Sequence, residues 1–514
     1  MKHDKIMIID YGSQYTQLIT RRVRELEVYA EIFPYDVTKE QIQSFSPKSI
    51  ILSGGPSSVY DKDAYLLSDD IVNANLPILG ICYGLQLLTH NLGGKITSRN
   101  RGEYGLSKVN FNNENEIFSD LSKSSNVWMS HGDEVESIGE GWDIIAESDN
   151  GIVAALQYKE KSFYGVQFHP EVVHTAEGLK IISNYLFKIS KCKPSWTPSN
   201  FITEAIQKIR EKVGDKKNVV CGLSGGVDSS VMATLMHRAI GERSNCIFVD
   251  HGLLRKDEAK EVMGSLKEGL NLNITKIEAK NLFLKKLEGV SDPEKKRKVI
   301  GEQFIRTFEN ATQRIQNISF LAQGTLYPDV IESGGSKLGP AVTIKSHHNV
   351  GGLPDDIKFE LIEPLRDLFK DEVREVGKEL GLPDFILGRH PFPGPGLAVR
   401  IIGDITKERI SILQEADQIF IDTLKEKNEY DKIWQAFAVL IPVKTVGVMG
   451  DLRTYENLIG LRAVTSRDGM TADWHKMPSS ILEICSNRII NEVKGVNRVV
   501  YDITSKPPGT IEWE

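Results

Sequence analysis

The chain has 514 residues, of which 40% are hydrophobic and 26% are charged, and its formal net charge is −7. This composition is typical of a globular protein, and the length predicts about two to four domains. The negative charge disfavours a broad nucleic-acid surface, and we find no apolar run that predicts a secretion signal or a membrane span. The five cysteines show no metal-ligand spacing, so we expect reduced thiols and a cytoplasmic location.

Residues 5–95 alternate apolar runs with amphipathic patterns. Residues 5–12 and 49–56 predict buried strands, and residues 14–26 have the apolar period of a helix. Residues 76–84 form a further apolar run that leads at once into a helical pattern. This alternation predicts a parallel sheet with helices on both faces.

A segment rich in proline and polar residues, 191–200, interrupts the pattern and predicts a linker. A second α/β alternation follows and runs to a Pro- and Gly-rich stretch at 389–400. Beyond it we expect a strand at 399–403, a long helix, and separate strands at 437–443 and 445–450. These elements are typical of a small α+β domain with a mixed or antiparallel sheet.

Cys82 lies where a predicted strand turns into a helix, within the sequence Gly-Ile-Cys-Tyr-Gly. Such an elbow exposes a nucleophile, and the helix N-terminus favours a thiolate. A thiol nucleophile needs a base and an orienting group, and His169 and Glu171 supply both on one side of an extended segment. The alternatives are a buried structural cysteine and a structural histidine.

A thiol that attacks a carbonyl carbon also needs donors for the oxyanion. Gly54 and Gly55 end another predicted strand and permit close approach of the backbone to a ligand. The N–H of Tyr83, which follows the nucleophile, is a second donor. The alternative for the glycine pair is an ordinary turn.

Four motifs together resemble the class I glutamine amidotransferases, and they lie at 53–60, 80–88, 130–133 and 165–171. The resemblance implies that Cys82 attacks the glutamine side chain, His169 relays protons and Glu171 orients His169. The residues that it implies for the oxyanion and for glutamine binding are Gly54, Gly55, Tyr83, Gln86, Ser130, His131 and Asp133.

Residues 224–230, Ser-Gly-Gly-Val-Asp-Ser-Ser, follow a predicted strand and precede a predicted helix. The amides of such a turn bind phosphate oxygens, and the helix N-terminus adds a favourable dipole. The loop lacks the lysine of the G-x-x-x-x-G-K-[ST] loop. It resembles the pyrophosphate loop of N-type ATP pyrophosphatases, which implies that the β and γ phosphates leave together. A Ser- and Gly-rich connecting loop is the alternative.

The ATP-binding residues implied by this resemblance and by strand ends are Ser224, Gly225, Gly226, Val227, Asp228, Ser229, Ser230, Val249, Gly324 and Lys345. Asp228 either binds the Mg²⁺ that accompanies ATP or shapes the loop, and the sequence leaves both open. Lys345 lies beside two histidines in a polar segment, which we interpret as a lid loop rather than a metal site.

The order of these motifs, followed by those at 363–374, 392–397 and 501–514, resembles the family of glutamine-hydrolysing GMP synthetases over the whole length. The resemblance implies that XMP, ATP, glutamine and water give GMP, AMP, pyrophosphate and glutamate. The xanthine O2 would be adenylated, and ammonia would displace AMP. The implied XMP-binding residues are Arg297, Arg462, Lys506, Ile511 and Glu512.

The resemblance implies an α/β protein of three domains. These are a class I glutamine amidotransferase domain at 1–193, a doubly wound parallel-sheet ATP pyrophosphatase domain at 194–389, and an α+β domain for dimerisation and XMP binding at 390–514. We expect XMP, ATP and glutamine as small-molecule partners, a homodimer through the C-terminal domain, and neither nucleic acid nor membrane as a partner.

Three rival functions remain at this point. A synthetase that makes NAD or asparagine shares the adenylating chemistry but should differ in its acceptor segments, and the C-terminal Ser-Lys-Pro-Pro-Gly-Thr run speaks against it. A CTP synthetase would lack the loop at 224–230. A catalytically inactive binding protein has no chemical need for Cys82, His169 and Glu171 together.

Overall fold

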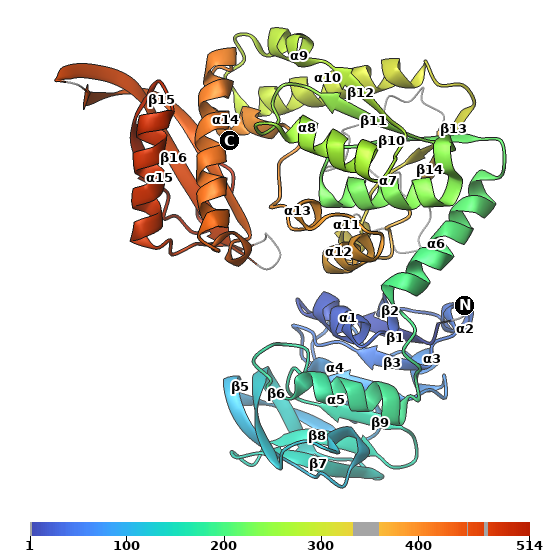
Figure 1. The fold of residues 1–514 in the computed structure, drawn as a ribbon. Helices are drawn as coiled ribbons and strands as arrows, with labels where there is room; N and C mark the ends of the chain where they lie inside the picture. Colours follow the sequence, from blue (N-terminus) through green and yellow to red (C-terminus); the bar gives the residue numbers. More distant parts are fainter. Residues whose placement is uncertain (1–2, 333–358, 450, 467–470) are drawn as a thin grey trace. The chain divides into compact units, whose positions relative to one another are not determined.

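The computed structural model describes residues 3–332, 359–449, 451–466 and 471–514. They fold into two compact units, residues 1–201 and 202–514 (Figure 1). The α/β fold class expected from the sequence is confirmed. The domain boundaries expected near 193 and 389 stay predictions.

Unit 1 contains a mixed sheet, and among the described residues it has nine strands in the order β2-β1-β3-β4-β9-β8-β7-β5-β6. The strands are β1 (Lys5–Asp10), β2 (Tyr29–Pro34), β3 (Ser49–Leu52), β4 (Ile78–Ile81), β5 (Lys95–Phe111), β6 (Ser124–Ser137), β7 (Trp142–Ser148), β8 (Val153–Tyr158) and β9 (Phe163–Val166). The half from β2 to β9 is parallel, as expected. The half from β9 to β6 is antiparallel, which the sequence pattern did not indicate.

The parallel half of this sheet is buried on both faces. Ile6 and Ile8 of β1 belong to one apolar core, and Met7 and Ile9 belong to another, as alternation along a strand requires. The helices of unit 1 are α1 (Thr16–Glu25), α2 (Lys39–Phe45), α3 (Asp69–Val72), α4 (Tyr83–Asn91) and α5 (Gly178–Asn184). The carboxyl ends of the strands therefore become the place where a site can form.

The segment that leaves unit 1 is anchored to it rather than loose. The backbone amides of Ser195 and Trp196 both donate to the carbonyl of Glu27. The indole of Trp196 packs edge-on against Tyr29, and the guanidinium of Arg24 lies over both rings. Helix α6 (Pro198–Val213) begins directly after this anchor.

Unit 2 begins with a parallel sheet, and its described strands have the order β12-β11-β10-β13-β14. These strands are β10 (Asn218–Gly222), β11 (Ser244–Asp250), β12 (Ile274–Glu278), β13 (Ile318–Ala322) and β14 (Glu360–Ile362). The accompanying helices are α7 (Val227–Ile240), α8 (Glu258–Val262), α9 (Lys280–Leu287), α10 (Pro293–Thr312), α11 (Tyr327–Glu332), α12 (Lys370–Glu379) and α13 (Asp384–Leu387). The switch in strand order between β10 and its two neighbours creates a crevice at the carboxyl edge.

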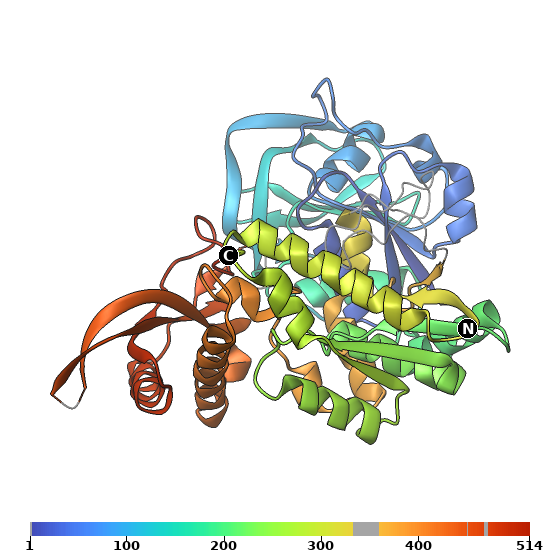
Figure 2. The ribbon, with the colours of Figure 1, turned by 90° about the horizontal axis from the view of Figure 1, so that it is seen from above.

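The last part of unit 2 is a smaller mixed sheet that packs against two helices. It consists of β15 (Gln435–Met449), β16 (Leu452–Thr465), β17 (Asp473–Trp474), β18 (Val496–Tyr501), α14 (Lys407–Glu426) and α15 (Ser479–Glu492). The inner parts of β15 and β16 pack against α14, and the outer end of their hairpin projects away from the rest of unit 2 (Figures 1 and 2).

Two expectations for this region are wrong. Residues Gly396–Arg400 form a 3₁₀ helix, and beyond them Ile401 makes only an isolated bridge to Leu440, so no strand runs through 399–403. Prolines at 393 and 395 fix the backbone in a turn just before it. The two strands expected at 437–443 and 445–450 are one strand, β15, whose pairing with β16 is irregular between Ile441 and Thr445. Pro442, which has no N–H, lies in that irregularity.

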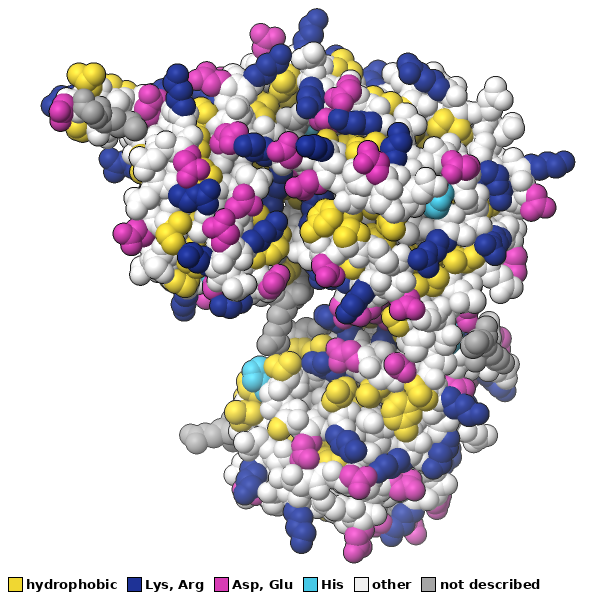
Figure 3. All heavy atoms as spheres, in the orientation of Figure 1, with side chains coloured by type: hydrophobic (Ala, Val, Ile, Leu, Met, Phe, Trp, Pro, Cys, Tyr) yellow, Lys and Arg dark blue, Asp and Glu magenta, His cyan; other side chains and the backbone are white. Residues whose placement is uncertain are grey.

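On the face of unit 2 seen in Figure 3, Lys and Arg side chains are interspersed with Asp and Glu. That mixture agrees with the modest negative net charge of the chain. Among the helices in the described ranges, none combines the length and apolarity that crossing a bilayer requires.

Candidate active sites

Cys82 stands on a sharp turn between β4 and α4 in unit 1. Its φ is +53° and its ψ is −105°, and α4 begins at the next residue. A Cβ on Gly84 would lie 2.7 Å from the carbonyl oxygen of Leu52, so the turn tolerates only glycine there. The Sγ of Cys82 lies 3.7 Å from the carbonyl oxygen of Ser130. The strained elbow expected from the sequence is present, and its thiol lies among the motifs predicted to surround it.

His169 and Glu171 form a buried pair beside this thiol. The Nδ1 of His169 lies 2.7 Å from Oε1 of Glu171, and the Glu171 side chain is fully buried. Burial by itself lowers the pKa of the imidazole, but the Glu171 carboxylate and the Cys82 sulfur raise it by more, so the pKa of His169 is raised to about 11. The ring therefore carries a proton at neutral pH and can give it to a leaving group.

The backbone around the ring is held from three sides. The amide of His169 donates to the carbonyl of Trp128, and the hydroxyl of Thr175 donates to the carbonyl of His169. The Nε of Arg22 donates to the carbonyl of Glu171 at 2.9 Å. Orientation of the base is thus built into the fold rather than left to side-chain rotamers.

Gly54 lies against the same histidine, and Gly55 lies against Tyr11. A Cβ on Gly54 would lie 3.3 Å from Cε1 of His169, and a Cβ on Gly55 would lie 2.8 Å from the carbonyl oxygen of Tyr11. A side chain at either position would therefore crowd the site. Backbone N–H groups can contact an oxyanion only where no side chain fills the space, and two glycines meet that requirement.

The remaining predicted glutamine-site residues are brought to the same edge of the sheet. The Nε2 of Gln86 donates to the carbonyl of Asp133 at 2.9 Å, and the Nδ1 of His131 donates to the same oxygen at 2.9 Å. Burial lowers the pKa of His131. One neighbour was not predicted: the side-chain amide of Gln167 donates to the Sγ of Cys82 at 3.7 Å. Its place two residues before His169 was the only available signal.

In unit 2 residues 223–226 join β10 to α7, and residues 227–230 form the first turn of α7, so the predicted order of strand, turn and helix is present. Gly225 has φ +78°, and Gly226 is the N-cap of α7. The hydroxyls of Ser224 and Ser229 lie 2.9 Å apart, and the amide of Gly226 donates to Oγ of Ser224 at 3.3 Å. The amides and hydroxyls thus converge at one helix N-terminus, which is a site for phosphate oxygens.

The cation that this loop lacks comes from a distant part of the chain. Lys370, the first residue of α12, forms an ion pair with Oδ2 of Asp228. Lys370 was not among the residues predicted for this site, although it lies within the motif at 363–374. Oδ1 of Asp228 is buried and has no hydrogen-bond partner among the described residues. This oxygen is therefore available to a ligand or a cation.

Three further residues were predicted to bind ATP. Two of them, Gly324 and Val249, lie at the ends of strands beside the loop, and Lys345 lies outside the described residues. A Cβ on Gly324 would lie 3.6 Å from Cβ of Asp228, so the end of β13 approaches the loop closely. Val249 is 3% exposed near the end of β11, the strand beside β10. Lys345 and its neighbouring histidines lie outside the described residues.

The residues predicted to bind XMP gather around the C-terminal segment. Glu512 accepts two hydrogen bonds from the guanidinium of Arg400, at 2.8 and 3.0 Å. Arg297 donates to the backbone oxygen of Glu514, and Ile511 is buried in a small apolar cluster. The backbone of Lys506 pairs with Ala472. The final residues are therefore docked on unit 2.

Arg462 is the most deeply buried of the residues predicted to bind XMP. Its side chain is 1% exposed and lies 3.3 Å from the carboxylate of Asp502. Its guanidinium also donates to the carbonyls of Thr504 and Thr510. Arg462 thus holds both ends of the turn that carries Lys506.

Three family models match successive parts of the chain. The model described as glutamine amidotransferase class-I matches residues 7–189, the one described as NAD synthase matches 199–429, and the one described as GMP synthase C terminal domain matches 422–513. Together with the two sites, these matches define a glutamine amidotransferase joined to an ATP pyrophosphatase.

Full-length relatives decide between the rival synthetases. A protein named GMP synthase [glutamine-hydrolyzing] from Brachyspira hyodysenteriae is 58% identical over 511 residues, which are 99% of either chain. Proteins of the same name from Carboxydothermus hydrogenoformans and Caldicellulosiruptor saccharolyticus are both 56% identical, over 99% and 100% of either chain respectively. The chain belongs to the family of glutamine-hydrolysing GMP synthases, which are glutamine-dependent ligases. The family expected from the motifs is confirmed, and the NAD-forming alternative is excluded as the identity of the whole chain.

Proposed function

We propose that the family's reaction is divided between two sites, with glutamine hydrolysis at Cys82 and adenylation of XMP at the loop 224–230. The single observation that carries this proposal is that one chain contains both the Cys82–His169–Glu171 site and the loop with its Asp228–Lys370 pair. Neither site alone accounts for a ligase that takes nitrogen from glutamine.

At the first site, the thiol proton of Cys82 is held by His169, and the sulfur bonds to Cδ of the glutamine side chain as the carbonyl oxygen becomes an oxyanion. Protonated His169 gives its proton to the departing nitrogen, so the C–N bond breaks and ammonia leaves a glutamyl thioester. His169 then takes a proton from water, whose oxygen bonds to Cδ. The Cδ–S bond breaks, glutamate leaves, and the proton on His169 is again shared with the Cys82 sulfur. Glu171, 2.7 Å from Nδ1, orients the ring and stabilises its charged form.

We assign the developing oxyanion to backbone N–H groups at Gly54, Gly55 and Tyr83. The close packing of the glycine pair against His169 and Tyr11 supports this assignment. Gln86, Ser130 and His131 would help to hold the glutamine. The carbonyl of Ser130 lies 3.7 Å from the thiol, and the side chains of Gln86 and His131 both bond to the carbonyl of Asp133 in the same segment. Removing one oxyanion donor typically costs about 10²- to 10³-fold in kcat.

At the second site, the amides and hydroxyls of the loop hold the β and γ phosphates of ATP. The O2 of XMP bonds to the α phosphorus, and the bond to the pyrophosphate oxygen breaks. Ammonia then attacks C2 of the purine, AMP leaves, and the nitrogen loses a proton to give GMP. Lys370 and the dipole of α7 would offset the charge of the leaving pyrophosphate.

The residues present fit a magnesium ion bound mainly through ATP. The free Oδ1 of Asp228 is one suitable oxygen ligand. Among the described residues there is no group of three His, Cys, Asp or Glu side chains that could hold a metal. Mg²⁺ would neutralise phosphate charge when bound with ATP, and the protein would contribute the carboxylate that locates it.

We assign XMP to Arg297, Lys506, Ile511 and Glu512 at the C-terminal segment, which docks on unit 2 beside α10. Cations near one phosphate monoester favour its binding. Arg462 would act by holding the turn that carries Lys506, since its guanidinium bonds to carbonyls at 504 and 510.

We propose a homodimer through the C-terminal sheet. Val446 and Tyr455 are register partners on β15 and β16, and they are 54% and 56% exposed. Val448, two residues along the same face, is 71% exposed. A contiguous apolar face on a sheet favours association with a second copy. We also propose a cytoplasmic location, in agreement with the five cysteines, which are all buried and free of disulfides.

The reaction itself is tested by incubating the protein with XMP, ATP, Mg²⁺ and glutamine and following GMP by chromatography. Production of GMP, AMP, pyrophosphate and glutamate in equal amounts supports the proposal. Adenylation of a different acceptor, with XMP left unchanged, contradicts it.

A further inference from the structure

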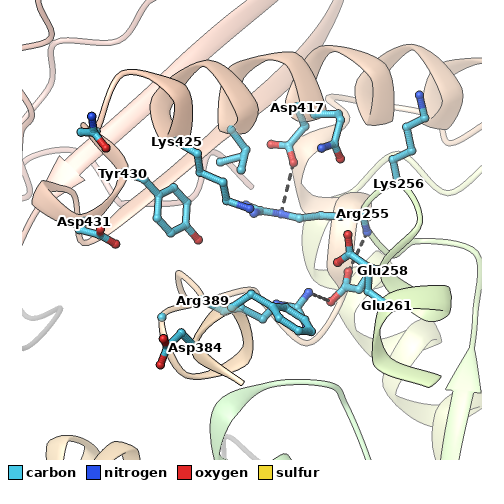
Figure 4. Close-up of a pocket in the computed structure, with 15 residues that line it drawn as sticks. Arg255, Lys256, Glu258, Glu261, Asp384, Arg389, Asp417, Lys425, Tyr430 and Asp431 are labelled. Atoms are coloured by element: carbon cyan, nitrogen blue, oxygen red, sulfur yellow. Dashed lines mark hydrogen bonds and ion pairs between the residues drawn. The ribbon is translucent and has the colours of Figure 1, made fainter. Parts of the chain in front are cut away.

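A pocket of about 300 Å³ lies between α8, α13 and α14, next to the pyrophosphate loop (Figure 4). Its walls include Arg255, Glu258, Arg389 and Asp417. Figure 4 shows the interactions that join Arg389 to Glu258 and Arg255 to Asp417. The chemistry proposed above assigns no role to any of these four residues.

Arg389 reaches from this pocket to the loop. Its Nη1 donates to the carbonyl oxygen of Gly225 at 2.8 Å. That oxygen and the amide of Gly226 belong to one planar peptide group and point in opposite directions. A guanidinium that fixes the carbonyl therefore also fixes the direction of the Gly226 N–H, which donates to Oγ of Ser224 in this structure and belongs to the phosphate cradle proposed above.

The loop needs such a restraint, because Gly225 has φ +78° and glycine gains no orientation from a side chain. A Cβ at this position would lie 2.7 Å from Cγ2 of Val262, so the backbone passes closely under α8. The side of the loop next to α8 is thus contacted by Val262 and by Arg389. Of these two, Arg389 supplies the directional bond.

Arg389 is itself held rigidly. Its Nη2 pairs with Oε1 of Glu258, whose side chain is 3% exposed. Oε2 of Glu258 accepts a hydrogen bond from the amide of Arg255 at 2.8 Å. A buried carboxylate with both oxygens occupied leaves the guanidinium little freedom, and removing either partner is costly.

The same cluster continues into the C-terminal part of unit 2. The Nε of Arg255 lies 3.2 Å from Oδ2 of Asp417, and Oδ1 of Asp417 accepts from the amide of Ala438 at 2.9 Å. The ring of His390, next to Arg389, is stacked on Tyr430 with centroids 3.7 Å apart. The support of Arg389 is therefore shared by α8, α14 and β15.

We propose that Arg389 is a positioning residue for the pyrophosphate loop, acting through the Gly225 carbonyl, with Glu258 as its anchor. The inference rests on the proposed function of the loop in holding pyrophosphate. It adds that the donor geometry of the loop depends on an arginine that does not itself contact the phosphates.

The test uses the full chain and measures pyrophosphate binding by calorimetry with Mg²⁺, and the KM for ATP with ammonia as the nitrogen source. In Arg389→Ala we expect about tenfold to hundredfold weaker pyrophosphate binding and a similar rise in KM, as for loss of a charged hydrogen bond. Guanidinium ion at a non-denaturing concentration should restore much of the binding. Rescue of this kind distinguishes positioning from a general loss of structure.

Arg374→Ala is the matched control. Arg374 also donates to a backbone carbonyl of unit 2, that of Leu387 at 3.1 Å, and its change should leave pyrophosphate binding unaltered. The inference is overturned if Arg389→Ala binds pyrophosphate with wild-type affinity. It is also overturned if Arg389→Ala and Arg374→Ala lose affinity equally and guanidinium ion restores neither. If Arg389→Ala does not fold, pyrophosphate binding is measured for Arg389→Lys instead. Wild-type affinity in Arg389→Lys would also overturn the inference. A wild-type protein that binds no pyrophosphate refutes the proposed function instead.

Discussion

Lys370 and Asp228 form an ion pair although 142 positions separate them in the sequence. The pair joins the first residue of α12 to the first turn of α7, at the mouth of the loop 224–230. It supplies a cation to a phosphate loop that has none of its own. It also leaves one oxygen of Asp228 free, so the carboxylate can contact Lys370 and a metal at the same time.

Asp228→Asn should lower GMP synthesis about tenfold or more with either glutamine or ammonia, because it removes the partner of Lys370 and weakens a metal ligand. Lys370→Met should raise the KM for ATP by a similar factor. Both are measured as steady-state rates. Glu302→Gln, which alters an exposed ion pair on α10, is the control and should behave as wild type. Normal rates in Asp228→Asn would remove this residue from the mechanism.

Cys82→Ala should abolish glutamine-dependent GMP synthesis and leave ammonia-dependent synthesis within about twofold of wild type, because the nucleophile serves only the first site. The comparison is made at saturating XMP and ATP, with glutamate release as a second readout. The substitution removes one sulfur from a site that is 5% exposed, so we expect little loss of stability. Failure of ammonia to rescue a folded variant would contradict the separation of the two sites.

Glu171→Gln should slow glutamine hydrolysis by about a hundredfold or more, a typical effect for an impaired acid–base pair. The carboxylate raises the pKa of His169, so its removal lowers that pKa and the ring loses its proton at a lower pH. The alkaline limb of kcat/KM for glutamine should therefore move to lower pH. An unchanged alkaline limb would show that Glu171 does not set the charge of His169.

The stability of unit 2 should fall as the pH drops below 6.5. Burial lowers the pKa of both His251 and His390 from 6.5 to about 4, so the unfolded chain binds protons in this window that the folded chain excludes. Each histidine should cost ~1.4 kcal/mol of unfolding free energy per pH unit between pH 6.5 and 4.

The pH effect is measured by urea unfolding at a series of pH values, for wild type and for His390→Gln. The variant should lose stability with a slope that is smaller by ~1.4 kcal/mol per pH unit, because one titrating group is gone. Its stability at pH 7 will also fall, since His390 bonds to Tyr430 and Ala436, but only the slope tests the prediction. Equal slopes would show that His390 is not kept neutral by burial.

Val446→Asp should dissociate the proposed dimer by placing a charge on the apolar face that it shares with Tyr455. The mass of the full chain in solution, measured by light scattering, should fall by half. Leu282→Asp is the control, since Leu282 is 44% exposed on α9, away from the C-terminal sheet. A wild-type mass equal to that of one chain would refute the dimer.

The antiparallel half of the sheet in unit 1 could not be predicted from the apolar pattern of the sequence. The apolar pattern identified β1, β3, β4, α1 and α4, because the strands are continuous apolar runs buried on both faces and each helix has the apolar period of a buried face. Strands β5 and β6 are long, half-exposed and irregular in register, so their pattern is weak. Around Gly396 and Pro442, backbone restrictions outweighed the apolar pattern and produced a 3₁₀ helix and a strand irregularity.

By itself, the sequence indicated the family and its two chemistries, and it predicted the residues that we assign to them. Cys82, His169, Glu171 and the loop 224–230 are recognisable because they lie in short segments whose local geometry their own residues dictate. The tertiary structure alone decided which distant side chains complete the sites. The contacts of Lys370, Arg389 and Arg462 form because helices, strands and loops that are distant in sequence meet in the fold. The sequence alone does not show whether a charged side chain faces water or contacts a distant loop.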